Sequence, residues 1–327
     1  MDSVHPSVSF RGAFESARRV LLTGPLDPDG DSLGACLALA RGLTALGVAE
    51  VQVAGTPAFR YQWMPGASSM VPDDAIAGPY DVAVVLDGDR RRLPATVDRA
   101  YSGARLKGLI DHHGSTDPTV YDLVYLEPSA ASTCELVYQL LQAWGVPIDA
   151  SLAALLYTGV LFDTGGFRHS NTRPSTHRLA ASLLEAGIDH ALIAARVLSE
   201  RRLSGQRLLG RVLCEARTLV NGAVIVGVVS RASLAELGAS EADIEGVVDS
   251  LVFTSGVEAA CLIVERAPER VKLSLRSRQS LDVAALARAI APGGGGHRRA
   301  AGVMMTCGLE EAESVTIEAL TGAVRAA

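Results

Sequence analysis

Carboxylate and imidazole side chains directly follow a short apolar segment in the first half of the chain. Residues 106–110 are mostly apolar and lead into the triplet Asp111-His112-His113. Both side-chain types are ligands for divalent transition metals, and open α/β sheets place their active sites at the ends of buried strands. The triplet alone also fits surface or capping residues, so its chemistry depends on whether other acids end other strands.

Three further apolar segments lead into aspartate in the same way: residues 82–86 before Asp87, residues 19–23 before Asp27, Asp29 and Asp31, and residues 155–162 before Asp163. Any one of these aspartates could instead cap a helix or form a turn, since Asp favours both positions. Four apolar segments that all carry carboxylate or imidazole at their carboxyl ends predict one shared metal site.

Such a site suits the hydrolysis of a phosphate ester. Two metals roughly 3.5–4 Å apart can hold both an attacking water and a phosphate oxygen. The pair needs one bridging carboxylate, and Asp87, alone at the end of a predicted central strand, is the natural bridge. Asp29 and Asp31 flank Gly30, whose freedom permits a tight turn that aims them at different metals. A helix starting near Asp31 would add a favourable dipole for bound anions.

Alternating strands and helices are predicted to position these groups. Helical spacing at residues 31–46 and 132–144, with a strand at 51–54 between them, indicates a mostly parallel sheet covered by helices. Residues 174–217 have a helical pattern, and apolar strands resume after about residue 218. We therefore expect an α/β protein with three parts: a metal-binding catalytic domain at 1–190, a helical connector at 191–217, and a smaller α/β substrate-binding domain at 218–327.

Composition limits the class of protein. A net charge of −6 argues against a non-specific nucleic-acid binder. The apolar segments are shorter than the roughly 20 residues that span a bilayer, and the N-terminus does not resemble a signal peptide. The five cysteines are widely scattered, which argues against a disulfide framework or a structural zinc site. We expect a cytoplasmic protein that does not contact membranes.

Together, the acidic and imidazole motifs resemble the four motifs of the DHH phosphoesterase family: Asp29-Gly30-Asp31, Asp87, Asp111-His112-His113 and Asp163. Residues 272–278 and 293–302 are similar to that family's DHH-associated C-terminal domain, so the resemblance covers nearly the whole chain. The two-domain arrangement is most similar to nano-RNase/pAp phosphatase proteins. The resemblance implies a manganese-dependent phosphohydrolase of short RNA oligonucleotides, linear or cyclic dinucleotides, or 3′-phosphoadenosine 5′-phosphate (pAp), with a homodimer as one expected assembly.

The resemblance also implies a division of roles. Asp87 would bridge two manganese ions, Asp29 would bind the first, and the second would be held by Asp31, His112 and Asp163. His113 would contact the scissile phosphate or assist the leaving group. Asp111 would orient a histidine from behind, as carboxylates near metal sites commonly do.

One position departs from this branch of the family. A histidine normally lies four residues before the first motif aspartate, and here that position is Pro25, which cannot bind a metal. Asp27 lies two residues before Asp29, and the resulting triple resembles the opening motif of the RecJ exonuclease branch. We hypothesise that Asp27 replaces the imidazole. The alternative is a first metal site that is weak, or that fills only when substrate arrives.

The C-terminal domain is predicted to bind the anionic substrate. Successive amides at residues 293–296 could form a nest for phosphate, and Arg276 could grip it with two hydrogen bonds. The alternative for the glycine run is a flexible loop. The expected substrate-binding residues are Arg276, Ser277, Gly294, Gly295, Gly296, His297 and Arg298. A domain that holds the far end of a short substrate would favour dinucleotides over long RNA.

Two other functions remain compatible with the sequence. A catalytically weak nucleotide-binding or sensing protein is supported only by Pro25. A RecJ-like single-strand exonuclease is disfavoured by the acidic balance and short chain, since a processive channel should be broadly basic.

Overall fold

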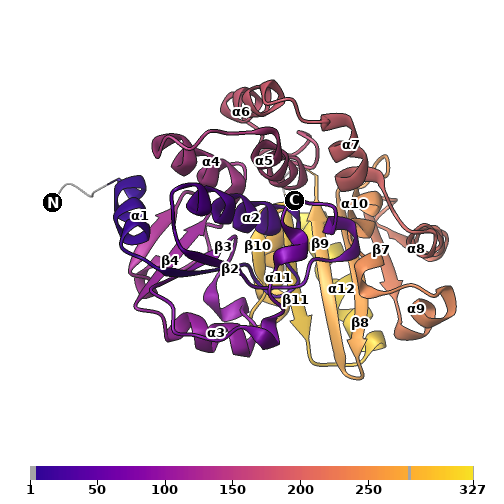
Figure 1. The fold of residues 1–327 in the computed structure, drawn as a ribbon. Coiled ribbons are helices and arrows are strands. Elements are labelled where there is room, and N and C mark those ends of the chain that lie inside the picture. The colour runs from indigo at the N-terminus through magenta and orange to yellow at the C-terminus, as the bar shows by residue number, and fades with distance from the viewer. Residues whose placement is uncertain (1–4, 279–280, 327) are drawn as a thin grey trace. The chain divides into compact units, whose positions relative to one another are not determined.

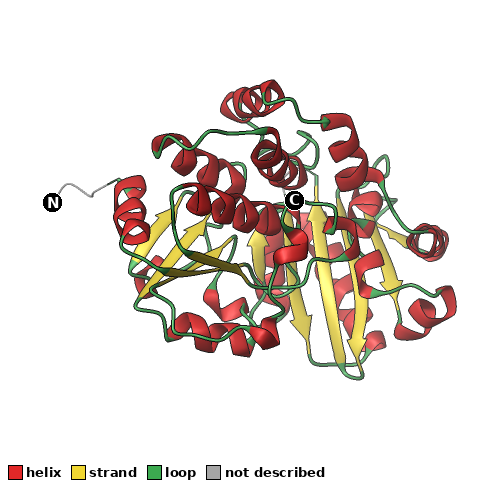
Figure 2. Cartoon of the chain, viewed as in Figure 1, coloured by secondary structure: helices red, strands yellow, loops and turns green. Residues whose placement is uncertain are grey.

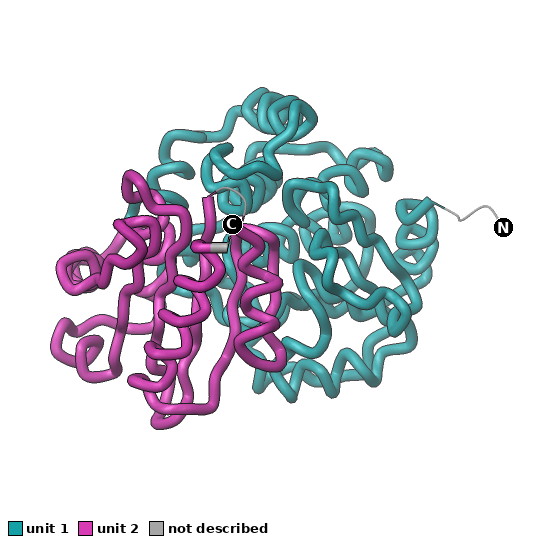
Figure 3. Tube along the Cα trace, turned by 180° about the vertical axis from the view of Figure 1, so that it is seen from behind, with its two compact units in different colours: residues 1–200 teal, residues 201–327 magenta. Residues whose placement is uncertain are grey.

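The computed structural model describes residues 5–278 and 281–326 and confirms an α/β fold (Figure 1). The chain divides into two compact units, residues 1–200 and 201–327 (Figure 3). Each unit is built on its own sheet with its own helices (Figure 2). Among the described residues, no helix is both long and apolar enough to cross a membrane.

The sheet of the first unit has five parallel strands in the order β2-β1-β3-β4-β5. The strands are β1 (Arg19–Thr23), β2 (Glu50–Val53), β3 (Val82–Leu86), β4 (Leu106–Asp111) and β5 (Leu123–Leu126). From β1 the chain moves outward to β2 and then returns to the other side of β1 to form β3. The reversal of strand order therefore lies between β1 and β3, the point at which open α/β sheets bind ligands beyond the carboxyl ends of the strands.

Helices cover both faces of this sheet. Alternate residues of β3 belong to different apolar clusters: Val82, Val84 and Leu86 pack with α1, α2, α4 and α5, whereas Ala83 and Val85 pack with α3. A strand buried on both faces needs a continuous apolar run, which is what β3 has. The helices are α1 (Pro6–Glu15), α2 (Gly30–Ala45), α3 (Ala95–Ser102), α4 (Thr133–Ala143), α5 (Ala150–Asp163), α6 (Pro174–Glu185) and α7 (His190–Ala194), followed by a π-helical turn at Ala195–Ser199.

The segment before Asp163 is not a strand. Residues 155–162, which we grouped with the strands, belong to α5, capped at its start by the side chain of Asp149. A short continuous apolar run looks the same in a buried strand and a buried helix, and its periodicity cannot separate them. An added Cβ at Gly159 of α5 would overlap the Asp31 carboxylate and Cys134 Sγ, so this glycine permits the close packing of α5 beside Asp31.

The second unit has a six-stranded sheet in the order β10-β11-β9-β8-β7-β6, in which only the β7–β8 pair is parallel. One face packs on α11 and α12, and the other packs mainly on α8 and α10. The strands are β6 (Arg217–Leu219), β7 (Val224–Val229), β8 (Ala259–Ala267), β9 (Arg270–Ser277), β10 (Gly295–His297) and β11 (Ala300–Met305). The helices are α8 (Leu203–Glu215), α9 (Arg231–Leu237), α10 (Val247–Val252), α11 (Val283–Ile290) and α12 (Leu309–Ala326).

Candidate metal centre

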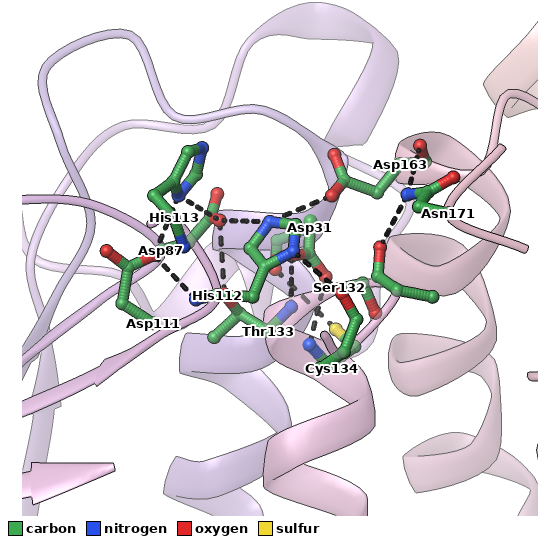
Figure 4. Close-up of polar contacts among 12 residues, drawn as sticks. Asp31, Asp87, Asp111, His112, His113, Ser132, Thr133, Cys134, Asp163 and Asn171 are labelled. Carbon is green, nitrogen blue, oxygen red and sulfur yellow. Dashed lines mark hydrogen bonds and ion pairs between the residues drawn. The ribbon is translucent and has the colours of Figure 1, made fainter. Parts of the chain in front are cut away.

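Buried acidic and imidazole groups meet at the carboxyl edge of the first sheet (Figure 4). Asp31 comes from the first turn of α2, Asp87 directly follows β3, and His112 directly follows β4. Each of the three offers a ligand atom within 4.8 Å of the other two, and all three side chains are buried. Asp31 and His112 are 81 positions apart in the sequence. They come together because the parallel strands β1, β3 and β4, which precede the three residues, end at the same edge of the sheet.

Asp87 is common to two groups of this kind. It belongs to the group with Asp31 and His112, and also to a second group with Asp111 and His113 whose ligand atoms lie within 4.8 Å of one another. Its backbone has a φ of 62°, a left-handed conformation that Asp tolerates better than most residues. Asp87 therefore lies between the Asp31–His112 pair and the Asp111–His113 pair.

Asp31 is held by the N-terminus of α4. The backbone amides of Thr133 and Cys134 donate to its two oxygens at 2.6 Å and 3.0 Å. The Thr133 hydroxyl donates to Asp87 Oδ1 at 3.1 Å, so one turn of helix orients both carboxylates. Ser132 caps this helix by accepting from the amide of Glu135. The Ser-x-x-Glu pattern marks a helix start, and the free amides of such a start bind anions, but the pattern does not show that Asp31 is the anion they bind.

His112 is oriented from both sides of its ring. Its Nδ1 lies 3.3 Å from the carbonyl of Ala130, which selects the tautomer with the proton on that nitrogen. Its Nε2 faces the acids, 2.9 Å from Asp163 Oδ2 and 3.6 Å from Asp87 Oδ1. Burial alone would lower the pKa of His112, but the charges of these acids raise it above its usual value.

Asp111 is occupied by hydrogen bonds. Its Oδ1 accepts from the amides of His112 and His113 and from His113 Nδ1 at 2.7 Å, while Oδ2 accepts from the Thr116 hydroxyl at 2.5 Å. Burial would raise the pKa of Asp111, but the hydrogen bond from His113 and the other donors lower it. Asp111 thus fixes the ring of His113, and Thr116 is a contributor that the sequence did not reveal.

The segment between β1 and α2 carries the remaining acids. Asp29 is the N-cap of α2, and its Oδ1 accepts from the amides of Asp31 and Ser32 at 3.0 Å and 3.1 Å. Asp27 is exposed, with a φ of 58°, and Pro25 is buried. Asp29 therefore has the helix-capping role that the sequence left open for each aspartate.

The donor set fits a divalent cation. Burial and the nearby acids raise the pKa of Asp31 to about 6 and that of Asp87 to about 7. Two neighbouring carboxylates that are hard to ionise are stabilised when a cation lies between them. Carboxylates with an imidazole suit a transition metal such as manganese. Asp31, Asp87 and His112 have ligand atoms close enough together to hold one, and Asp163 contacts His112 beside them.

These shifts predict how the stability of the protein depends on pH when a chelator is present. The ordinary pKa of Asp is 3.8, so the folded protein keeps protons on Asp31 and Asp87 that the unfolded chain has lost. Stability should therefore fall as pH rises from about 4 to about 7. His113 acts in the same direction: its pKa is raised to about 9, because hydrogen bonding to Asp111 outweighs burial, and its contribution is lost above its unfolded value.

Thermal midpoints measured with chelator at about pH 5 and about pH 7 check this prediction. Asp87→Asn removes one of the two raised carboxyls and should show a smaller fall between the two values than the wild type. Equal falls in both proteins would contradict it.

The residues predicted to bind substrate lie in the second unit, in β9, in β10, at Gly294 just before β10, and in the turn after β10. Arg276 Nε donates to Asp249 Oδ1 at 2.8 Å, and the Ser277 hydroxyl donates to the carbonyl of Leu281. Gly295 and Gly296 are in strand β10 with His297, and Arg298 begins the turn to β11. Two residues of the glycine run, Gly295 and Gly296, are thus paired with β11 and are not part of a free loop, whereas Gly293 and Gly294 precede the strand. An added Cβ at Gly294 would overlap the carbonyl of Ala287 in α11, so packing alone explains one of these glycines.

Comparison with known proteins gives consistent matches to both units. The family models described as "DHH family, N-terminal domain" and "DHHA1 domain" match residues 19–160 and 221–325. The bifunctional oligoribonuclease and PAP phosphatase NrnA of Thermus thermophilus is 34% identical over 299 residues, covering 90% of this chain and 87% of the relative. The protein of the same name from Bacillus subtilis is 29% identical over 227 residues, covering 68% and 70%. The crystal structure of an exopolyphosphatase-related protein from Bacteroides fragilis superimposes with a TM-score of 0.86 at 27% identity, covering 97% of this chain and 96% of that one.

Proposed function

Because this chain belongs to the DHH family of phosphoesterases, we propose that it is a manganese-dependent phosphohydrolase of very short oligonucleotides, dinucleotides or pAp. The observation that carries the proposal is the buried group of Asp31, Asp87 and His112 at the carboxyl edge of the first sheet. The names of the relatives from Thermus thermophilus and Bacillus subtilis, both oligoribonucleases and PAP phosphatases, support the choice of substrate class.

The ligand roles are those that the family resemblance implies. Asp87 would bridge two ions, Asp29 would bind one, and Asp31, His112 and Asp163 would hold the other. When bound, the ions supply an activated water and neutralise charge on the phosphate. The amides of Thr133 and Cys134 keep Asp31 in place, so that its carboxylate needs little rearrangement as the ions enter.

His113 is assigned to the substrate. Asp111 fixes its ring through Nδ1, so Nε2 is the atom expected to face the phosphate. In the metal-free protein the hydrogen bond to Asp111 outweighs burial and raises the pKa of this imidazole to about 9, which favours a proton on Nε2. As water adds to phosphorus and the ester P–O bond breaks, the proton on Nε2 passes to the leaving oxygen or stabilises the charge that develops.

The second unit is proposed to bind the remainder of the substrate. Its basic and glycine-rich strand-turn segment, Gly294 to Arg298 with Arg276, offers hydrogen-bond donors for an anionic group. Ser277 is left out of this set because its hydroxyl and its amide donate to the carbonyls of Leu281 and Arg299. Such an arrangement favours short substrates. Steady-state rates with manganese on pAp, a linear dinucleotide and a long single-stranded RNA test this directly. Faster cleavage of the long RNA would contradict the proposal and favour an exonuclease.

The same assay separates the proposal from a sensing function. That second candidate rests on Pro25, which removes one expected metal ligand. A sensing protein would bind these nucleotides without turning them over, whatever metal is added. Repeated turnover of any of the short substrates excludes it.

Asp27 is proposed to take the place of the missing imidazole. We expect Asp27→Asn to weaken the binding of one manganese ion by about tenfold or more, as loss of a ligand should. Asn is the preferred replacement because it tolerates the positive φ of Asp27. Calorimetric titration with manganese measures the effect, with the exposed Asp74→Asn as the control. Unchanged stoichiometry and affinity would rule out this role and leave a weak first site.

A further inference from the structure

Asn171 joins the two elements that flank the metal centre. Its Nδ2 donates to the carbonyl of Ala131 at 2.9 Å and to the carbonyl of Asp163 at 3.2 Å (Figure 4). Both acceptors are backbone oxygens, so only the amide nitrogen can face them, and the orientation of the side chain is determined. The Asn171 amide therefore links Ala131, which precedes the cap residue of α4, to Asp163, the last residue of α5.

The two carbonyls that Asn171 contacts belong to segments that position different carboxylates of the site. Ala131 precedes the cap residue Ser132, and the α4 turn that follows holds Asp31 through the amides of Thr133 and Cys134. Asp163, at the other anchor point, contacts His112 through its own side chain at 2.9 Å. The bond from Asn171 to the Asp163 carbonyl fixes the backbone from which that carboxylate extends.

We propose that Asn171 is a positioning residue that sets the separation of Asp31 from Asp163, and thereby the affinity of the metal site they share. The inference rests on the proposed function only in assigning a metal to these residues. Asn171 contacts the backbone of the site and none of the ligand atoms, so its effect is on the binding of the ion and not on the reacting atoms.

The sharpest change is Asn171→Asp, which keeps the size of the side chain. It replaces a donor of two hydrogen bonds by an anionic oxygen that faces two carbonyl oxygens, so the α4 turn and the end of α5 are pushed apart. Changes at residues that orient ligands typically cost about 10–100-fold in metal affinity. Asn171→Ala removes the donors without adding a charge and should have a smaller effect of the same kind.

Manganese titration by calorimetry, well below the thermal midpoint of each variant, tests the proposal. We expect about 10–100-fold weaker binding in Asn171→Asp, and a loss of turnover at limiting manganese that excess manganese largely recovers. Asn221→Asp makes the same chemical change in an exposed turn of the second unit and should match the wild type. A lower thermal midpoint with wild-type manganese affinity in both Asn171 variants would overturn the proposal. If the wild type hydrolyses none of the substrates yet the variants bind manganese more weakly, the proposed function fails and the role of Asn171 stands.

Discussion

Asp87→Asn is expected to abolish hydrolysis while leaving the metal-free protein as stable as the wild type, or more so. The activity loss should be at least about 10³-fold, because in the proposed centre this carboxylate would serve both ions. The stability gain follows from burial and the nearby Asp31, which raise the pKa of Asp87 to about 7. An amide at this position carries no charge to bury, and its oxygen can still accept from the Thr133 hydroxyl.

A buried aspartate of the second unit provides the matched control. Asp243 is also buried, but it is paired with Arg202 at 2.7 Å. Burial would raise the pKa of Asp243, but hydrogen bonds from the Ser240 amide and from Arg202 lower it. Asp243→Asn should therefore lower the thermal midpoint and keep the activity, the reverse of Asp87→Asn. Turnover with saturating manganese and thermal unfolding with chelator measure the two effects. An active Asp87→Asn protein would refute the assignment of the bridge.

His113→Ala is expected to lower kcat by about 10²–10⁴-fold, the range in which a positioned proton donor contributes. Manganese stoichiometry should stay the same, because His113 is assigned to the substrate and not to the metals. His112→Ala should differ by losing manganese affinity as well. The exposed His190→Ala, on α7, is the control. Loss of a bound ion in His113→Ala, with kcat recovered by excess manganese, would show that the two histidines were assigned the wrong way round.

The parts of the centre that were predictable from sequence are those that follow strands. Asp87 and Asp111 could be located because a buried parallel strand is a continuous apolar run, and a charged residue marks where that run ends. Sequence order then places their carboxylates at one edge of the sheet. The predicted fold class is confirmed for the same reason: strand and helix periodicities alternate along the first unit and resume in the second.

The parts that were missed act through the backbone or depend on packing. Thr133 and Cys134 hold Asp31 with main-chain amides, which any residue type supplies, so their identity carries little signal. Asn171 contacts two carbonyls that are far apart in sequence. The segment before Asp163 was assigned to the wrong element because an apolar run has no periodicity to distinguish a buried helix from a strand.

The most direct test of the central claim is the turnover of a linear dinucleotide and of pAp by chelator-treated protein, with and without added manganese. If the buried acids and His112 hold catalytic metals, the treated protein is inactive, and manganese restores many turnovers per chain on at least one of the two substrates. Undiminished turnover after chelation, or no turnover of either substrate at any manganese concentration, would contradict the account.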